Sequence, residues 1–149
     1  MFYKMIENKC KEWYSSDQCT VRNLIEYIEK TGQMRDAQIE AIKVYLFLKI
    51  GCECKPLEFL FRYGCFNSIN LNDIELSTAT REYLEENPAA TALFEYSRLT
   101  NDKGEQVSEK LEKQIKKDPS SIDYDAFFRT AFYGVSYTDY LFSLPMGAG

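Results

Sequence analysis

Residues 42–50, IKVYLFLKI, constrain the fold more than any other stretch, because as a helix they are apolar on nearly every side. A helix of that kind has to be buried on most of its faces. The residues from Met34 to this stretch are more polar, and Gly51 follows it as a stop. We therefore expect one helix over 34–50, with its second half at the centre of a helical bundle.

Much of the remaining chain shows the spacing of amphipathic helices. Between 20 and 32, four apolar residues fall at i, i+3, i+4 and i+7: Val21, Leu24, Ile25 and Ile28. We expect Thr20 to cap this helix and Gly32 to end it in a left-handed conformation. Similar patterns predict helices over 4–12, 57–63, 77–86, 88–99, 105–118 and 124–133.

Residues 65–76 lack a helical pattern. Ile69 and Leu71, then Ile74 and Leu76, alternate with polar positions, and three Asn and one Asp disfavour a helix. A short strand or an extended loop fits this segment. The predicted fold class is therefore mainly α, a compact multi-helix domain with at most one or two short strands.

Composition narrows the functional classes. Eleven Tyr, ten Phe and one Trp indicate a packed globular body. The net charge of −5 argues against this chain being the main nucleic-acid-binding surface, which usually needs a basic face. No run approaches eighteen apolar residues, so we expect no membrane span.

Five cysteines and no histidine shape the expected chemistry. An odd count is not a disulfide framework, and it indicates a reducing, cytoplasmic location. Cys52, Cys54 and Cys65, joined by Cys10 or Cys19, could supply four zinc ligands, but the paired spacing of structural zinc sites is missing. We expect no metal site. Without histidine, the commonest general base is also absent.

The last ten residues carry a different pattern. Residues 140–144 are apolar and predict a short buried strand, which runs into Pro145 and then Gly147-Ala-Gly149. A strand followed by a glycine-rich loop is how a phosphate-binding P-loop begins. A complete P-loop continues with a Lys that reaches the phosphates and a Ser or Thr that holds Mg²⁺. The sequence ends one residue before that Lys is due.

The residues LPMGAG at 144–149 resemble motif I of superfamily 2 DEAD/DEAH-like helicases and type III restriction-type translocases. A second segment resembles the Arg-x-x-Gln-x-x-Ala-Ile motif that such enzymes carry upstream of motif I, and its matching residues are Arg35, Gln38, Ala41 and Ile42. In that motif the Gln contacts the adenine edge. The resemblance implies ATP and Mg²⁺ as cofactors of a longer parent protein. It assigns nucleotide binding to Arg35, Gln38, Pro145, Gly147 and Gly149.

The spacing of the two motifs departs from the family. In most relatives they lie a few tens of residues apart, whereas here more than a hundred residues separate Gln38 from Gly147. The resemblance then implies a helical domain over 1–135, with 51–135 as an insertion between the two motifs. Residues 136–149 would begin a truncated P-loop ATPase core, with 140–144 as the displaced first strand of its sheet.

The expected function is the N-terminal helical region of a nucleic-acid-dependent ATPase, a helicase or translocase that acts on DNA or RNA. We expect this portion to lack catalysis and to need no cofactor of its own, because the P-loop Lys and the Mg²⁺ ligands are missing from it. An exposed terminal strand could pair two copies as a homo-oligomer. The alternative is a helical protein–protein interaction module unrelated to nucleotides.

Overall fold

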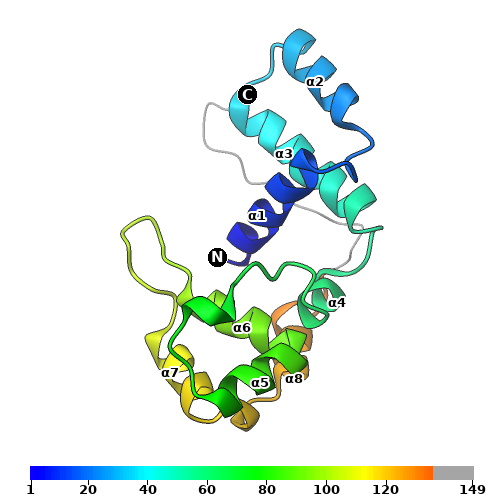
Figure 1. Cartoon of the computed structure of the whole chain (residues 1–149). Helices are drawn as coiled ribbons and strands as arrows, with labels where there is room; N and C mark the ends of the chain where they lie inside the picture. Colours follow the sequence, from blue (N-terminus) through cyan, green and yellow to red (C-terminus); the bar gives the residue numbers. More distant parts are fainter. Residues whose placement is uncertain (136–149) are drawn as a thin grey trace. The chain divides into compact units, whose positions relative to one another are not determined.

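A computed structural model describes residues 1–135 of the chain, which form eight α-helices and no strand. The predicted mainly α class is confirmed, and the expected strand over 140–144 lies outside the described residues. The chain divides into two compact units (Figure 1). Within the described residues, unit 1 comprises Met1–Met5 and Leu57–Gly134, and unit 2 comprises Ile6–Pro56 together with Val135. The long segment of unit 1 covers most of the range 51–135, whose role as an insertion stays a prediction.

The first three helices are α1 (Phe2–Ser15), α2 (Arg22–Thr31) and α3 (Asp36–Leu46), and a π-helical turn at Phe47–Gly51 extends α3. The next three are α4 (Leu57–Arg62), α5 (Thr78–Glu86) and α6 (Pro88–Arg98). The last two are α7 (Glu109–Lys117) and α8 (Tyr124–Ala131). Short 3₁₀ turns occur at Leu71–Asp73 and Pro119–Ser121.

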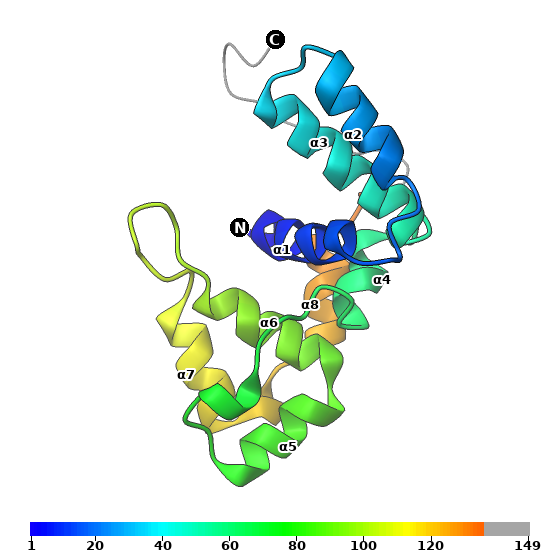
Figure 2. The same cartoon turned by 45° about the horizontal axis from the view of Figure 1, so that its top comes forward.

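Unit 2 is built on the α2–α3 hairpin. Figures 1 and 2 both show α2 and α3 side by side, and their antiparallel course follows from the short connection between them. Ile25 of α2 and Ile39 of α3 are buried, and the rings of Trp13 and Phe47 lie 5.6 Å apart between centroids. These apolar contacts pack α3 against the rest of unit 2.

Unit 1 is organised around the ring of Phe61, which is fully buried. Phe128 and Phe132 stack against it, with centroids 5.6 and 5.1 Å away, and Phe66 meets it edge-on at 4.8 Å. Such aromatic pairs add to the free energy of burial. The central helix of unit 1 is α6, because eight of its residues are buried on all sides and it contacts α4, α5, α7 and α8.

The expectation that residues 42–50 are buried on most sides was only partly right. Phe47 and Leu48 are buried, but the side chains of Tyr45 and Ile50 are 44% and 40% exposed. The α-helix ends at Leu46 and the backbone widens into the π-helical turn. In a π-helical turn the side chains are spaced differently from those of an α-helix. The buried and exposed faces predicted from α-helical spacing are therefore not kept in this turn.

Two of the predicted caps were wrong. Val21, not Thr20, is the N-cap of α2, and no side chain caps it. Gly32 keeps right-handed helical geometry at φ −81°, because its N–H still donates to the carbonyl of Ile28. The left-handed residue is Gln33, at φ 47°, one position later. The cap prediction failed because Gly32 continues the helical turn.

Of the two alternatives left open for residues 65–76, the structure has the loop: the segment contains a 3₁₀ turn and no strand, and its Leu71 and Ile74 are buried. The polar helix expected over 105–118 begins only at Glu109, because residues 100–106 form a tight turn and Ser108 then caps α7. Ser77 caps α5 and accepts a hydrogen bond from the Thr80 N–H.

Candidate nucleotide-binding site

The start of α3 carries the two site residues that the structure describes. Arg35 is the N-cap residue, with extended backbone at φ −77° and ψ 155°. Its carbonyl accepts hydrogen bonds from the N–H groups of Gln38 (2.9 Å) and Ile39 (3.1 Å). In the reverse direction, the N–H of Arg35 donates to Oε1 of the Gln38 side chain at 2.9 Å. Gln38 thus satisfies the N-cap N–H, as the third-position residue of a capping box does.

The start of α3 has one side packed against the rest of unit 2 and one side accessible to solvent. Ile39 is buried, and Ala41 and Ile42 are half-buried, so the apolar positions of the motif face the unit 2 core. Arg35 is exposed and Gln38 is half-buried. The polar members of the pattern therefore share an accessible helix end, while the apolar members anchor it.

The two side chains retain binding capacity there. Within residues 1–135, nothing accepts a hydrogen bond from the Gln38 amide nitrogen, and no carboxylate pairs with the Arg35 guanidinium. A cation at the positive end of a helix dipole is unfavourable, so Arg35 is not placed there to stabilise α3. The arrangement offers an amide and a guanidinium to a ligand that carries polar ring atoms or negative charge.

The other proposed nucleotide contacts, Pro145, Gly147 and Gly149, lie outside the described residues. Among the described residues, the structure brings Arg35 and Gln38 together at the start of α3. A site shared with the glycine-rich segment remains a prediction.

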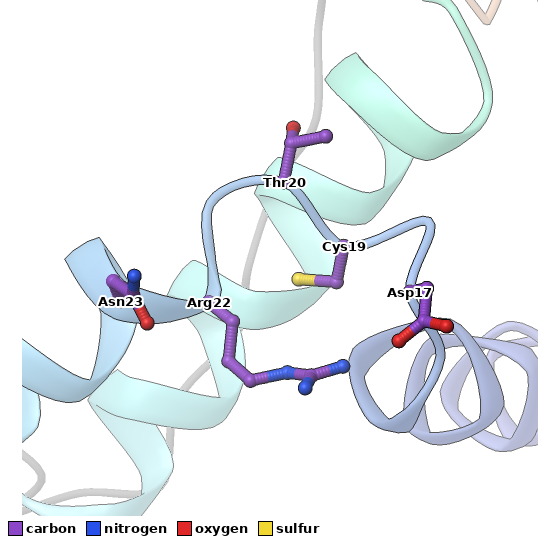
Figure 3. A pocket seen from close by; sticks show the side chains of 5 residues that line it. All are labelled: Asp17, Cys19, Thr20, Arg22 and Asn23. Carbon is purple, nitrogen blue, oxygen red and sulfur yellow. The ribbon is translucent and has the colours of Figure 1, made fainter.

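A separate pocket of about 170 Å³ opens at the start of α2 (Figure 3). It is polar, and its lining residues are Asp17, Cys19, Thr20, Arg22 and Asn23. Because α2 and α3 run antiparallel, the start of α2 lies about 15 Å along its ten residues from the end nearest Gln38. The pocket is therefore not part of the Arg35–Gln38 site.

Arg22 explains much of the geometry of this pocket. Its side chain extends toward the end of α1, where Nε donates to the Tyr14 carbonyl at 3.0 Å and one Nη donates to the Ser16 carbonyl (Figure 3). The guanidinium thus satisfies backbone oxygens where α1 ends. Sequence analysis did not find this pocket, because its residues form no motif and only the break after Ser15 marks the place.

The cysteines do not form a metal-binding centre in the described part of the chain. No three His, Cys, Asp or Glu side chains among residues 1–135 are placed to hold a metal ion. Burial, reinforced by the nearby Glu40, raises the pKa of the Cys10 thiol to about 12, which keeps it protonated and unreactive at neutral pH. None of the helices over the same residues has the length and apolar character that crossing a membrane requires.

Comparisons with protein-family models, with curated proteins and with solved structures gave no match for this chain. A functional proposal therefore rests on the chemistry of the residues themselves.

Proposed function

We propose that this chain is the N-terminal helical region of a nucleic-acid-dependent ATPase of the helicase or translocase type. In this proposal the start of α3 contacts the adenine of ATP. The observation that supports it most is the arrangement of the motif residues: Gln38 and Arg35 occupy one accessible helix end, while Ala41 and Ile42 face the core.

The chemistry of the amide suits an adenine edge. Adenine presents an N6–H donor beside the N7 acceptor, and a glutamine amide offers an acceptor beside a donor. Oε1 of Gln38 already accepts from the Arg35 N–H, but a carbonyl oxygen has a second lone pair. The helix cap and a base contact are therefore compatible.

The remaining parts of the nucleotide site would come from the parent protein. The backbone at Pro145, Gly147 and Gly149 would approach the phosphates, and a following Lys and Ser or Thr would bind the phosphates and Mg²⁺. DNA or RNA would bind mainly to the motor, since the net charge of −5 disfavours a phosphate-binding face here.

The test is ATP hydrolysis by the protein of the complete reading frame, with and without DNA or RNA. Gln38→Glu keeps an oxygen that can cap α3 and removes the N–H donor, so it should raise KM for ATP about tenfold while helicity is retained. Gln18→Ala, at an exposed residue of the same unit, is the matched control and should leave KM unchanged. Absence of ATP hydrolysis, or a Gln38→Glu enzyme with normal KM, would overturn the proposal.

A second function, self-association as a helical interaction module, has one observation in its favour. On α2, the side chains of Leu24 and Tyr27 are 51% and 63% exposed and lie at i and i+3 on the helix surface. Exposed apolar side chains that adjoin one another are typical of interfaces. Sedimentation of the chain should then show a dimer that Leu24→Ser and Tyr27→Ser together dissociate. A monomer at all concentrations would exclude this function.

A further inference from the structure

We propose that residues 47–54, which follow α3, form a strained hinge with two states: the π-helical turn of this structure and a rewound, regular α-helix. The hinge lies wholly in unit 2, and unit 1 resumes shortly after it, at Leu57. Rewinding would change the direction in which the chain leaves unit 2. The inference is independent of the nucleotide-binding proposal, because that site lies at the opposite end of α3.

The hydrogen bonds of the turn depart from those of an α-helix. In an α-helix the N–H of Cys52 would donate to the carbonyl of Leu48, but here it donates to the carbonyl of Phe47, at 2.8 Å. The N–H of Cys54 donates to the Leu48 carbonyl instead, at 3.2 Å. The turn therefore holds one residue more than a regular helical turn, as a π-helical turn does.

The two residues that end the hinge have left-handed backbone. Glu53 has a φ of 55° and Cys54 has a φ of 56°, and neither is the glycine that this region favours. Left-handed geometry is costly for a residue with a Cβ, and it usually occurs at single positions. In a rewound helix both residues would take right-handed geometry, so rewinding would release this strain.

A buried indole group faces the same turn. Trp13 is 5% exposed, and among residues 1–135 its Nε1–H has no hydrogen-bond acceptor. A Cβ added to Gly51 would stand 3.0 Å from that nitrogen, so the indole edge lies close to the backbone of the hinge. An unpaired buried donor costs free energy, which is a second cost borne by the π-helical state. Trp13 is also the single tryptophan of the chain, so its indole signal reports on this turn alone.

Apolar packing opposes the strain and holds the hinge in its π-helical state. Phe47, Leu48 and Cys52 are buried, and the rings of Trp13 and Phe47 contact each other. Removing the extra residue from the turn would rotate the residues after it by about 100° around the helix axis, so this packing would have to rearrange. An element on which packing and backbone strain act in opposite directions has two discrete arrangements rather than a continuous range.

Substitutions at two positions shift the balance in opposite directions. Glu53→Gly relieves the strain at φ 55° and should favour the π-helical state. Glu53→Ala is its matched control, because it keeps the strained Cβ and removes the same exposed ion pair with Lys55. Gly51→Ala should favour the rewound state, since its Cβ would stand 2.8 Å from Cδ2 of Phe47 in the π-helical turn and alanine suits an α-helix better than glycine.

NMR relaxation dispersion on the 149-residue chain, at the Trp13 indole N–H and the amides of 47–54, measures the population of the rewound state. We expect about 1–10% in the wild type. Glu53→Gly should lower this population at least about fivefold, and Gly51→Ala should raise it by a similar factor. Glu53→Ala should change it by less than about twofold. Gly104→Ala, in unit 1 and with no atom near its added Cβ, should leave it unchanged.

Three results would overturn the proposal. One is the absence of exchange at Trp13 and the hinge amides in both the wild type and Gly51→Ala. Another is an equal effect of Glu53→Gly and Glu53→Ala, which would show that left-handed strain does not set the balance. The third is a minor state whose Cα chemical shifts at Glu53 and Cys54 are those of an unfolded chain, because rewinding predicts α-helical shifts there. If Gly51→Ala does not fold, the wild type and the two Glu53 variants decide the question.

Discussion

Replacing Glu112 of α7 with Gln should destabilise unit 1 by about 1–2 kcal/mol at neutral pH. The Glu112 side chain is 12% exposed and accepts hydrogen bonds from Arg98 Nη1 (2.5 Å), Gln106 Nε2 (2.5 Å) and Lys116 Nζ (2.8 Å). Burial by itself would raise the pKa of this carboxyl group, but the hydrogen bonds from Lys116 and Gln106 and the charge of Arg98 lower the pKa from 4.5 to about 2.

The magnitude follows from that pKa. A fall from 4.5 to about 2 corresponds to an upper bound of about 3.4 kcal/mol, at 1.36 kcal/mol for each pH unit. The side chains of Arg98 and Lys116 are 36% and 35% exposed, so water screens both partners and the expected effect is about half of the bound or less. Because the folded-state pKa is lowered, this stability is present above about pH 4.5 and is lost as the pH falls toward 2.

The assay is urea unfolding followed by far-UV circular dichroism, at pH 7 and at points between pH 4.5 and 3. Trp13, which belongs to unit 2, reports separately by fluorescence on the unit that should be unaffected. Glu109→Gln is the matched control on the same helix, because Glu109 is 69% exposed and lies 3.4 Å from Lys113. Its expected cost is less than about 0.5 kcal/mol.

The result that would refute this reasoning is a Glu112→Gln deficit that stays the same from pH 7 to pH 3. Equal losses for Glu112→Gln and Glu109→Gln would refute it as well, since the buried network would then contribute no more than an exposed pair.

Two further predictions concern packing in unit 1, and urea unfolding measures both. Phe61→Ala should lower the free energy of unfolding by about 3–5 kcal/mol, because the ring is fully buried and stacks on two other phenylalanine rings. Tyr63→Ala, at a residue that is 60% exposed, should lower it by less than about 1 kcal/mol. Equal losses for the two variants would contradict the assigned core. Gly64→Ala should destabilise more than Gly104→Ala: both have positive φ, but only at Gly64 would the added Cβ meet a neighbour, Asn67 Nδ2, at 2.7 Å. A larger loss at Gly104 would show that this contact is relieved at no cost.

The helical class could be predicted because the apolar spacing persists through most of the chain. What the spacing did not show is which helix is central. Residues 42–50 are more apolar than α6, yet α6 is the buried helix of unit 1. Its small residues Ala89, Ala90 and Ala92 let neighbouring helices approach it closely. The division into two units has no mark in the composition, because it depends on which helices contact each other.

Local errors had local causes. Glycine often ends a helix in the left-handed conformation, but the N–H of Gly32 donates a hydrogen bond that continues the helix. The left-handed residue is therefore Gln33, one position later. The late start of α7 was not visible because residues 105–108 have helix-compatible side chains, and the turn that holds them depends on Asn101, whose Oδ1 accepts from the Lys103 and Glu105 N–H groups.

The nucleotide-binding role of the candidate residues stays a prediction. The pattern Arg-x-x-Gln-x-x-Ala-Ile located an accessible helix end, with Arg35 and Gln38 on it. The hydrogen bond between them was not predicted, because a capping box is recognised by Ser or Thr at the N-cap, and here the backbone of an Arg takes part. The pocket beside Arg22 could not be found from sequence either, since main-chain carbonyls of α1 position that side chain.

The most direct test of the proposed function is the coding sequence immediately after Gly149. The proposal predicts Lys followed by Ser or Thr, which would complete a P-loop that begins with Gly147. Any other residues at those two positions, or a stop codon, would contradict a nucleotide-binding function for this chain.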